Sequence, residues 1–134
     1  MVMLCHTALD RAEQVARHWA ERDCPVVIHV DRSVARDAFN EFCRSLSDLE
    51  NVRFCLRHRC EWGTWSLVEA SQTASEMLLS EFPSVRHVYL VSGSCLPLRP
   101  VEDLRSYLAA RPMTDFIESV TISEVDWTVG GLNE

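Results

Sequence analysis

Three side chains that could bind or orient a ligand follow apolar runs of this chain: His6, Asp31 and Trp62. A carboxylate such as that of Asp31 accepts hydrogen bonds from a ribose hydroxyl or from a base N–H. An indole ring such as that of Trp62 stacks on the flat face of a base or a sugar. Each has a structural alternative, because Asp31 suits the positive end of a following helix and Trp62 can pack on its own loop. The residue types alone leave binding and packing both open.

The segment Glu61–Ala70 combines two tryptophans and a glycine immediately before a patterned helix. Gly63 permits backbone angles that other residues disfavour. Ser66 and Glu69 have the spacing of a capping box, which predicts that the helix opens there. We predict that Trp65 packs beneath the sheet as part of the scaffold. The segment therefore reads as a rigid loop that delivers aromatic and polar groups to the start of a helix.

The amino-acid composition of the chain excludes several classes of function. Acidic residues outnumber basic ones by 20 to 13, and the formal net charge is −7. Non-specific binding of nucleic acid needs a basic face, so nucleic acid is not expected as a partner. Every basic residue is an arginine, which excludes a Schiff-base lysine and the lysine of a P-loop. The glycine patterns of dinucleotide sites, P-loops and nucleophile elbows do not occur.

The six cysteines do not form a recognisable metal pattern. Cys55 and Cys60, with His58 between them, are a poor zinc pattern because a second pair is missing. We favour free, mostly buried thiols that behave as small hydrophobic side chains. The chain shows neither a signal peptide nor an apolar run long enough to span a membrane. The expected location is therefore cytoplasmic, where disulfides are not expected.

Apolar runs and amphipathic segments alternate along the chain. Five runs predict strands at Val2–Cys5, Pro25–Val30, Val52–Leu56, His87–Val91 and Asp115–Ile122. Four segments between them have the apolar spacing of helices, with predicted starts at Thr7, Ser33, Trp65 and Pro100. This order is typical of a doubly wound α/β fold, in which helices cover both faces of a mainly parallel sheet. We expect one domain over residues 1–134.

Ligands of such sheets bind beyond the carboxyl ends of the strands. The polar and small residues of this chain gather at those ends, at Cys5–His6, Asp31–Ser33, Arg57–Trp62, Ser92–Leu98 and Glu118. Glu118 lies within an apolar run, where a carboxylate must pair, lie at an edge or face a cleft. The sequence therefore predicts a ligand site at the carboxyl edge of the sheet.

Three segments, taken in order, carry a resemblance to a known family. They are His29–Asp31 (HVD), Trp62–Ala70 (WGTWSLVEA) and Tyr89–Leu98 (YLVSGSCLPL). Their order and spacing resemble the core-2/I-branching β-1,6-N-acetylglucosaminyltransferases and their xylosyltransferase relatives. The likeness extends over nearly the whole chain. It departs from the family pattern at Cys95, where the family commonly has an aspartate.

The resemblance implies a GT-A type, Rossmann-like fold that binds a UDP-sugar donor and a glycan acceptor. The implied donor is UDP-N-acetylglucosamine, with xylose left open, and the implied reaction is an inverting β-1,6 transfer without a divalent metal or another cofactor. Glu118 falls where the family places a glutamate that contacts the acceptor. The implied donor-binding residues are Leu4, Cys5, His6, Asp31, Arg32, Ser33 and Trp62.

The same resemblance puts the catalytic glutamate and the basic residues that hold the diphosphate beyond residue 134. We therefore expect this chain to be the donor-binding half of the enzyme, truncated at its C-terminus and without a catalytic base of its own. An apolar face exposed by truncation favours a homo-oligomer. The alternative is a non-catalytic nucleotide-binding or assembly module with the same fold.

Overall fold

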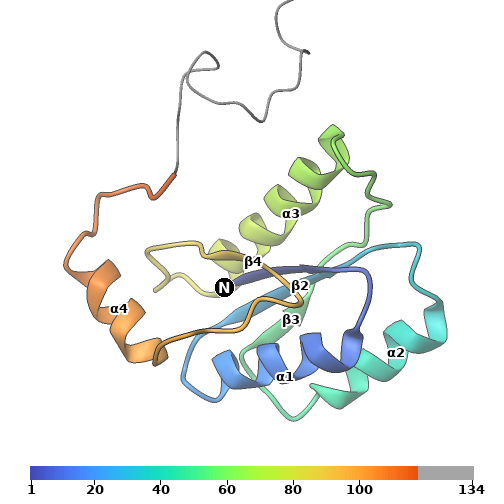
Figure 1. Ribbon diagram of the computed structural model, residues 1–134, viewed down its shortest axis with the longest axis horizontal. Coiled ribbons are helices and arrows are strands. Elements are labelled where there is room, and N and C mark those ends of the chain that lie inside the picture. Colours follow the sequence, from blue (N-terminus) through green and yellow to red (C-terminus); the bar gives the residue numbers. More distant parts are fainter. Residues whose placement is uncertain (118–134) are drawn as a thin grey trace, which may run out of the picture.

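The computed structural model describes residues 1–117, which form a four-stranded parallel sheet with helices on both faces (Figure 1). The order of the strands across the sheet is β3-β2-β1-β4. The strands are β1 (Val2–Cys5), β2 (Val26–Val30), β3 (Val52–Phe54) and β4 (Leu90–Ser92). The helices are α1 (Leu9–Ala20), α2 (Arg36–Ser45), α3 (Trp65–Glu81) and α4 (Val101–Ala109). The predicted doubly wound α/β fold is confirmed.

The two central strands, β1 and β2, have the mainly apolar composition of strands in a parallel sheet that is covered on both faces. Every residue of β2 is buried, because the strand is paired on both edges and covered on both faces. β1 pairs with β2 from Val2 opposite Val27 to Cys5 opposite Val30, so the two strands end at the same level. Their carboxyl ends therefore lie side by side at one edge of the sheet.

The two faces of the sheet bury different amounts of apolar surface. The larger cluster joins α1, α2 and the sheet through residues such as Val15, Phe42 and Ile28, and Val101 of α4 belongs to it. The smaller cluster packs α3 on the opposite face through Ala74, Leu78 and residues of the strands. Figure 1 shows α1 and α2 beneath the sheet and α3 above it. Because helices cover both faces, the carboxyl ends of the strands are where we look for the predicted ligand site.

Two predicted helix starts are wrong, and the predicted start of α3 at Trp65 is confirmed without the capping box expected there. α1 begins after Ala8, whose backbone is left-handed (φ 47°), and the hydroxyl of Thr7 does not cap it. α2 begins at Arg36 instead of at Ser33. α3 begins at Trp65, as predicted, but Ser66 does not form a capping box. The reason in α3 is that the Ser66 hydroxyl accepts the Glu61 N–H (2.9 Å), so it closes the preceding turn instead of capping the helix.

Trp65 is another correction, because it does not pack beneath the sheet. Its side chain is 68% exposed. α3 buries Ala70, Ala74 and Leu78, which share one face of the helix. Trp65 precedes Ala70 by five residues, which turns it about 140° away from that face. The apolar residue therefore points to solvent at the first turn of the helix.

The last two predicted strands have different outcomes. β4 is shorter than expected, and most of the final predicted strand lies outside the described residues. β4 starts at Leu90, not at His87, since it pairs only with the short β1, from Val2 opposite Leu90 to Leu4 opposite Ser92. Residues 115–117 are not in a strand, and the rest of the predicted strand Asp115–Ile122 lies outside the described residues. Exposed apolar side chains, including Tyr89 and Leu90, lie along β4.

Within residues 1–117, no helix is long and apolar enough to cross a membrane. All six cysteines are free thiols, but the predicted burial holds only for Cys5 and Cys55. The cytoplasmic location and the homo-oligomer stay predictions.

Candidate functional site

A cavity of about 400 Å³ lies at the carboxyl ends of β1, β2 and β4. Its volume falls in the range of small-molecule and cofactor sites. The order of the strands reverses between β1 and β4, and ligands of doubly wound sheets bind at such a reversal. The lining residues are Leu4, Cys5, His6, His29, Asp31, Ser33, Cys60, Trp62, Leu67 and Ser92.

Asp31 joins the end of β2 to the segment between β3 and α3, which we call the β3–α3 loop (residues 55–64). One carboxylate oxygen accepts the Ser33 N–H (2.7 Å) and the other accepts the Cys60 N–H (2.7 Å). The side chain is nearly buried, with 6% of the residue exposed. Burial raises the pKa of the Asp31 carboxyl, but the hydrogen bonds from Ser33 and Cys60 outweigh it and lower the pKa to about 2. The cavity therefore contains a permanent negative charge at neutral pH.

This geometry excludes the structural interpretation of Asp31, in which its carboxylate lies at the positive end of the following helix. α2 begins only at Arg36, so Asp31 does not act at the positive end of that helix. Its carboxylate instead closes an Asx turn on Ser33 and fixes the β3–α3 loop. Each carboxylate oxygen has two lone pairs, so one acceptor position per oxygen remains after these bonds. Asp31 can shape the cavity and still accept a hydrogen bond from a ligand.

His29, which the sequence interpretation did not assign to the site, lies in its lining. It is 1% exposed, and its Nε2 accepts the main-chain N–H of His58 (2.9 Å). The two imidazole rings are stacked, with centroids 5.7 Å apart. His29 precedes Asp31 by two residues and so faces the same side of β2. That period of two was the signal that could have identified it.

Arg57 fixes the same loop from its other side. Its guanidinium donates to the carbonyl oxygens of Val30 (3.2 Å), Asp31 (2.7 Å) and Val34 (2.6 Å). It also lies over the ring of Phe39, 4.4 Å from the centroid. The guanidinium group is thus bonded to main-chain carbonyl oxygens, and Arg57 holds the loop against the segment that precedes α2.

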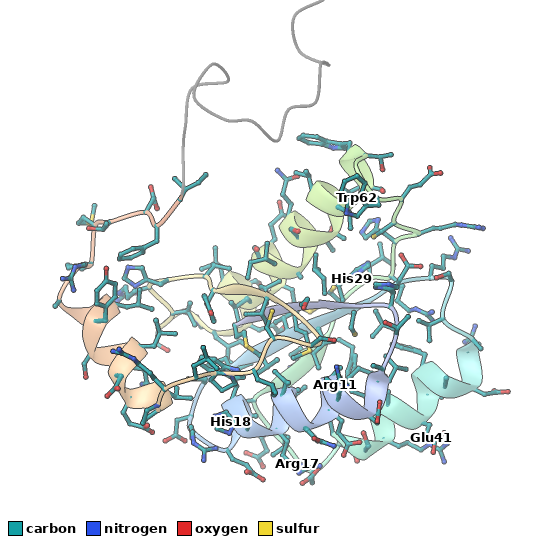
Figure 2. The ribbon with its side chains drawn as sticks, viewed as in Figure 1. Arg11, Arg17, His18, His29, Glu41 and Trp62 are labelled. Atoms are coloured by element: carbon teal, nitrogen blue, oxygen red, sulfur yellow. The ribbon has the colours of Figure 1, made fainter. Side chains whose placement is uncertain are left out.

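Trp62 lies at the rim of the cavity and is 93% exposed. It therefore does not pack on its own loop, which was the structural alternative. Gly63 next to it has a left-handed backbone (φ 76°), as the sequence suggested, and Thr64 closes the turn by donating its hydroxyl to the Glu61 carbonyl (2.8 Å). Figure 2 shows Trp62 near the start of α3, with His29 deeper toward the sheet. The indole ring is free to stack on a flat ligand.

The opposite wall of the cavity comes from Ser92, the last residue of β4, and Gly93 follows it directly. The Gly93 N–H donates to the carbonyl of Leu4 (2.9 Å), which continues the pairing of β4 with β1. A Cβ at Gly93 would lie 2.7 Å from the Cβ of Cys5 and 3.0 Å from the Cβ of Ala12. The absence of a side chain lets β4 approach β1 and α1 this closely.

The thiol of Cys5 lies between these two walls. It donates to the carbonyl of His29 (3.6 Å). Burial, with a smaller effect of the neighbouring Cys55, raises the pKa of Cys5 to about 12. The thiol is therefore protonated and unreactive at neutral pH.

Six of the seven predicted donor-binding residues line this one cavity: Leu4, Cys5, His6, Asp31, Ser33 and Trp62. Arg32 does not line it; it is exposed, and its main-chain N–H donates to the His58 carbonyl (2.9 Å). Glu118 lies outside the described residues. The lining residues missing from the prediction are His29, Cys60, Leu67 and Ser92. Among residues 1–117, no three His, Cys, Asp or Glu side chains are grouped so that they could hold a metal ion.

The parallel sheet, the helices on both faces and the cavity at the reversal of strand order define a Rossmann-like α/β protein of the GT-A type. The family model of the core-2/I-branching enzymes matches residues 1–132. The chain therefore belongs to the core-2/I-branching enzyme family, which is a family of glycosyltransferases. No curated protein gives a significant match.

Proposed function

We propose that this chain binds the UDP-sugar donor of a β-1,6-N-acetylglucosaminyltransferase. The observation that carries the proposal is the cavity at the carboxyl ends of β1, β2 and β4, which gathers His6, Asp31 and Trp62. The family match supports a glycosyltransferase, and the donor is the substrate that a cavity at this position of the sheet suits. We further propose that the partner substrate is a glycan hydroxyl.

Charge indicates which part of the donor enters the cavity. The Asp31 carboxylate is ionised at neutral pH and would repel a diphosphate. It can accept a hydrogen bond from a ribose hydroxyl or from the N–H of a uracil ring. Trp62 at the rim offers a flat apolar face to the same group. We therefore assign the uridine end of the donor to this cavity.

The proposed reaction is a direct displacement with inversion. A base removes the proton of the acceptor hydroxyl, its oxygen bonds to the anomeric carbon, and the bond from that carbon to UDP breaks. Basic side chains stabilise the departing diphosphate by charge-assisted hydrogen bonds, in place of a divalent metal. No D-x-D occurs in the sequence. We assign no base among the described residues, and Glu118 stays our candidate for acceptor contact.

Calorimetry with UDP and Trp62→Ala tests the donor site. We expect Trp62→Ala to weaken UDP binding about tenfold or more, since stacking of a base on an aromatic ring is worth about 1–3 kcal/mol. Trp65→Ala is the matched control, because Trp65 is also exposed and close in sequence but does not line the cavity. A folded protein that does not bind UDP, or an equal loss in both variants, overturns the proposal.

Two further titrations refine the donor. UDP-N-acetylglucosamine should bind more tightly than UDP-xylose if N-acetylglucosamine is the transferred sugar. Addition of EDTA should leave the affinity for UDP unchanged, and a clear loss would show that a divalent metal is required.

A further inference from the structure

Side chains attach the β3–α3 loop to the end of β2 at two points, His29 and Asp31, in addition to one main-chain bond from the Arg32 N–H to the His58 carbonyl (2.9 Å). Regular pairing of β2 with β3 ends at the bond from the Cys55 N–H to the Ile28 carbonyl (3.1 Å). Beyond it, the His58 N–H donates to His29 and the Cys60 N–H donates to Asp31. His29 of β2 and Asp31, which directly follows β2, thus accept from two alternate residues of the loop. This arrangement holds the loop that carries Trp62.

The two acceptors differ in how they respond to a proton. The Asp31 carboxylate keeps its charge down to about pH 2. The imidazole of His29 accepts only while Nε2 is unprotonated, and protonation turns that nitrogen into a donor. An N–H group would then face the N–H of His58, and both donors would lose their partner in a buried place.

We propose that His29 is a proton-sensitive positioning residue: its neutral ring holds the part of the β3–α3 loop around His58 against β2, and its protonation releases that part of the loop and weakens nucleotide binding. The weakening of nucleotide binding rests on the proposed function, whereas the release of the loop does not.

The groups around His29 come from four elements. Asp31 on the same strand favours the charged ring, whereas His58 and Arg57 on the loop oppose it. The thiol of Cys5 on β1 donates to the main-chain carbonyl of His29 and leaves the ring untouched.

From α3, Glu69 and Thr73 reach the ring of His58, at 3.9 Å and 3.1 Å, and hold it against His29. From the cavity side, His6 and Cys60 share the lining with His29. Burial, followed by the neighbouring His58, lowers the pKa of His29 below its ordinary value near 6.5.

The direction of the pH effect follows from that lowered pKa. Between the two pKa values the unfolded chain binds a proton at this histidine that the folded chain does not bind. Stability from the neutral ring is therefore complete above about pH 6.5 and decreases as the pH falls through the pKa of the folded state. The local release of the loop follows the same direction.

Amide hydrogen exchange of the wild-type chain tests the release without any ligand. The His58 amide should lose protection, corrected for the intrinsic exchange rate, when the pH falls from about 7.5 to about 5.5. The Cys60 amide, held by Asp31, is the internal control and should keep its protection. At the higher pH, the ¹⁵N shifts of the His29 ring should report an unprotonated Nε2 and a protonated Nδ1. A His58 amide that is equally protected at both pH values overturns the proposal.

Calorimetry with UDP over the same pH range tests the consequence for the site. The wild-type affinity should fall roughly tenfold per pH unit at most, the limit for one proton. In His29→Gln the side-chain carbonyl supplies an acceptor that does not titrate, so the affinity should change much less. His87→Gln, on the opposite end of the sheet from the cavity, should behave as the wild type. An equal pH dependence in His29→Gln overturns the role of His29.

The outcomes separate the two proposals. Failure of UDP to bind at any pH overturns the proposed function and leaves the exchange measurement to decide the role of His29. Constant protection of the His58 amide overturns the role of His29 even where UDP binds. If His29→Gln does not fold, the exchange measurement on the wild type still decides.

Discussion

The two walls of the cavity are built in opposite ways. The β2 wall, formed by His29, Asp31 and the β3–α3 loop, is held by hydrogen bonds from main-chain N–H groups to side-chain acceptors. The β4 wall, formed by Ser92, is held by close contact at the next residue, because Gly93 lies directly against side chains of β1 and α1. One wall depends on polar groups and the other on the absence of a side chain.

This difference indicates how each wall responds to change. Buried hydrogen bonds to a carboxylate or an imidazole depend on protonation state, so the β2 wall should respond to pH. Packed contacts depend on volume, so the β4 wall should respond to an added methyl group and not to pH. The four predictions that follow separate the two walls, in order of decreasing effect.

Asp31→Ala should have the largest effect, because it removes the partner of two partly buried N–H groups. Two hydrogen bonds to a charged group make the expected loss about 3 kcal/mol of the free energy of unfolding. Urea unfolding followed by circular dichroism measures it. Asp31→Asn keeps one acceptor oxygen and should lose less. A loss under about 1 kcal/mol would mean that other contacts hold the loop.

Gly93→Ala should lower the free energy of unfolding by about 2 kcal/mol, because overpacking of a tight contact forces the backbone to shift. The new Cβ would lie 2.7 Å from the Cβ of Cys5. Urea unfolding again measures the loss. Ser94→Ala is the neighbouring control and should change stability by less than about 0.5 kcal/mol. Equal values for the two variants would show that β4 moves freely.

Acid should weaken the β2 wall through Asp31. The pKa of this carboxyl is lowered from its ordinary value near 3.8 to about 2, so its contribution is present above pH 3.8 and is lost as the pH falls toward 2. Between those pH values the wild type should lose about 2 kcal/mol more stability than Asp31→Asn. Thermal unfolding at each pH measures the difference. Parallel curves for the two proteins would contradict it, whereas Gly93→Ala should keep the wild-type slope.

Gly63→Ala should have the smallest effect, about 1 kcal/mol, because its left-handed backbone disfavours a Cβ although the space around it is open. Gly63→Asn is the matched control, since asparagine tolerates this conformation better than alanine. Urea unfolding should rank the glycine first, asparagine second and alanine last. A loss as large as that of Gly93→Ala would mean that space, not conformation, limits this position.

The layers of the fold could be predicted because each strand and helix has its own periodicity. The continuous apolar run of β2 and the spacing of Ala70, Ala74 and Leu78 in α3 are local patterns. Helix starts could not be predicted as well, since Ser33 and Ser66 have cap-like positions in sequence but use their polar groups in turns. The start of β4 depends on the length of β1, which is a property of the pairing.

The position of the candidate site could be predicted from the sequence, but the relative importance of its residues could not. The carboxyl ends of parallel strands lie at one edge of the sheet. Six of the predicted residues are at these ends, and they therefore lie close together. His29 looked like any buried strand residue, because only the fold brings the His58 N–H to its ring. Trp62 and Trp65 looked alike in composition, although only Trp62 lines the cavity.

The sequence by itself determined the α/β class, the edge of the sheet where the candidate site lies and the resemblance to one family of glycosyltransferases, because these depend on local periodicity and motif order. Only the tertiary structure decided which polar groups hold the site together. Hydrogen bonds between β2 and the β3–α3 loop join residues about thirty positions apart in the chain, such as His29 and His58. Such bonds depend on the positions of both partners in space, which no pattern along one segment records.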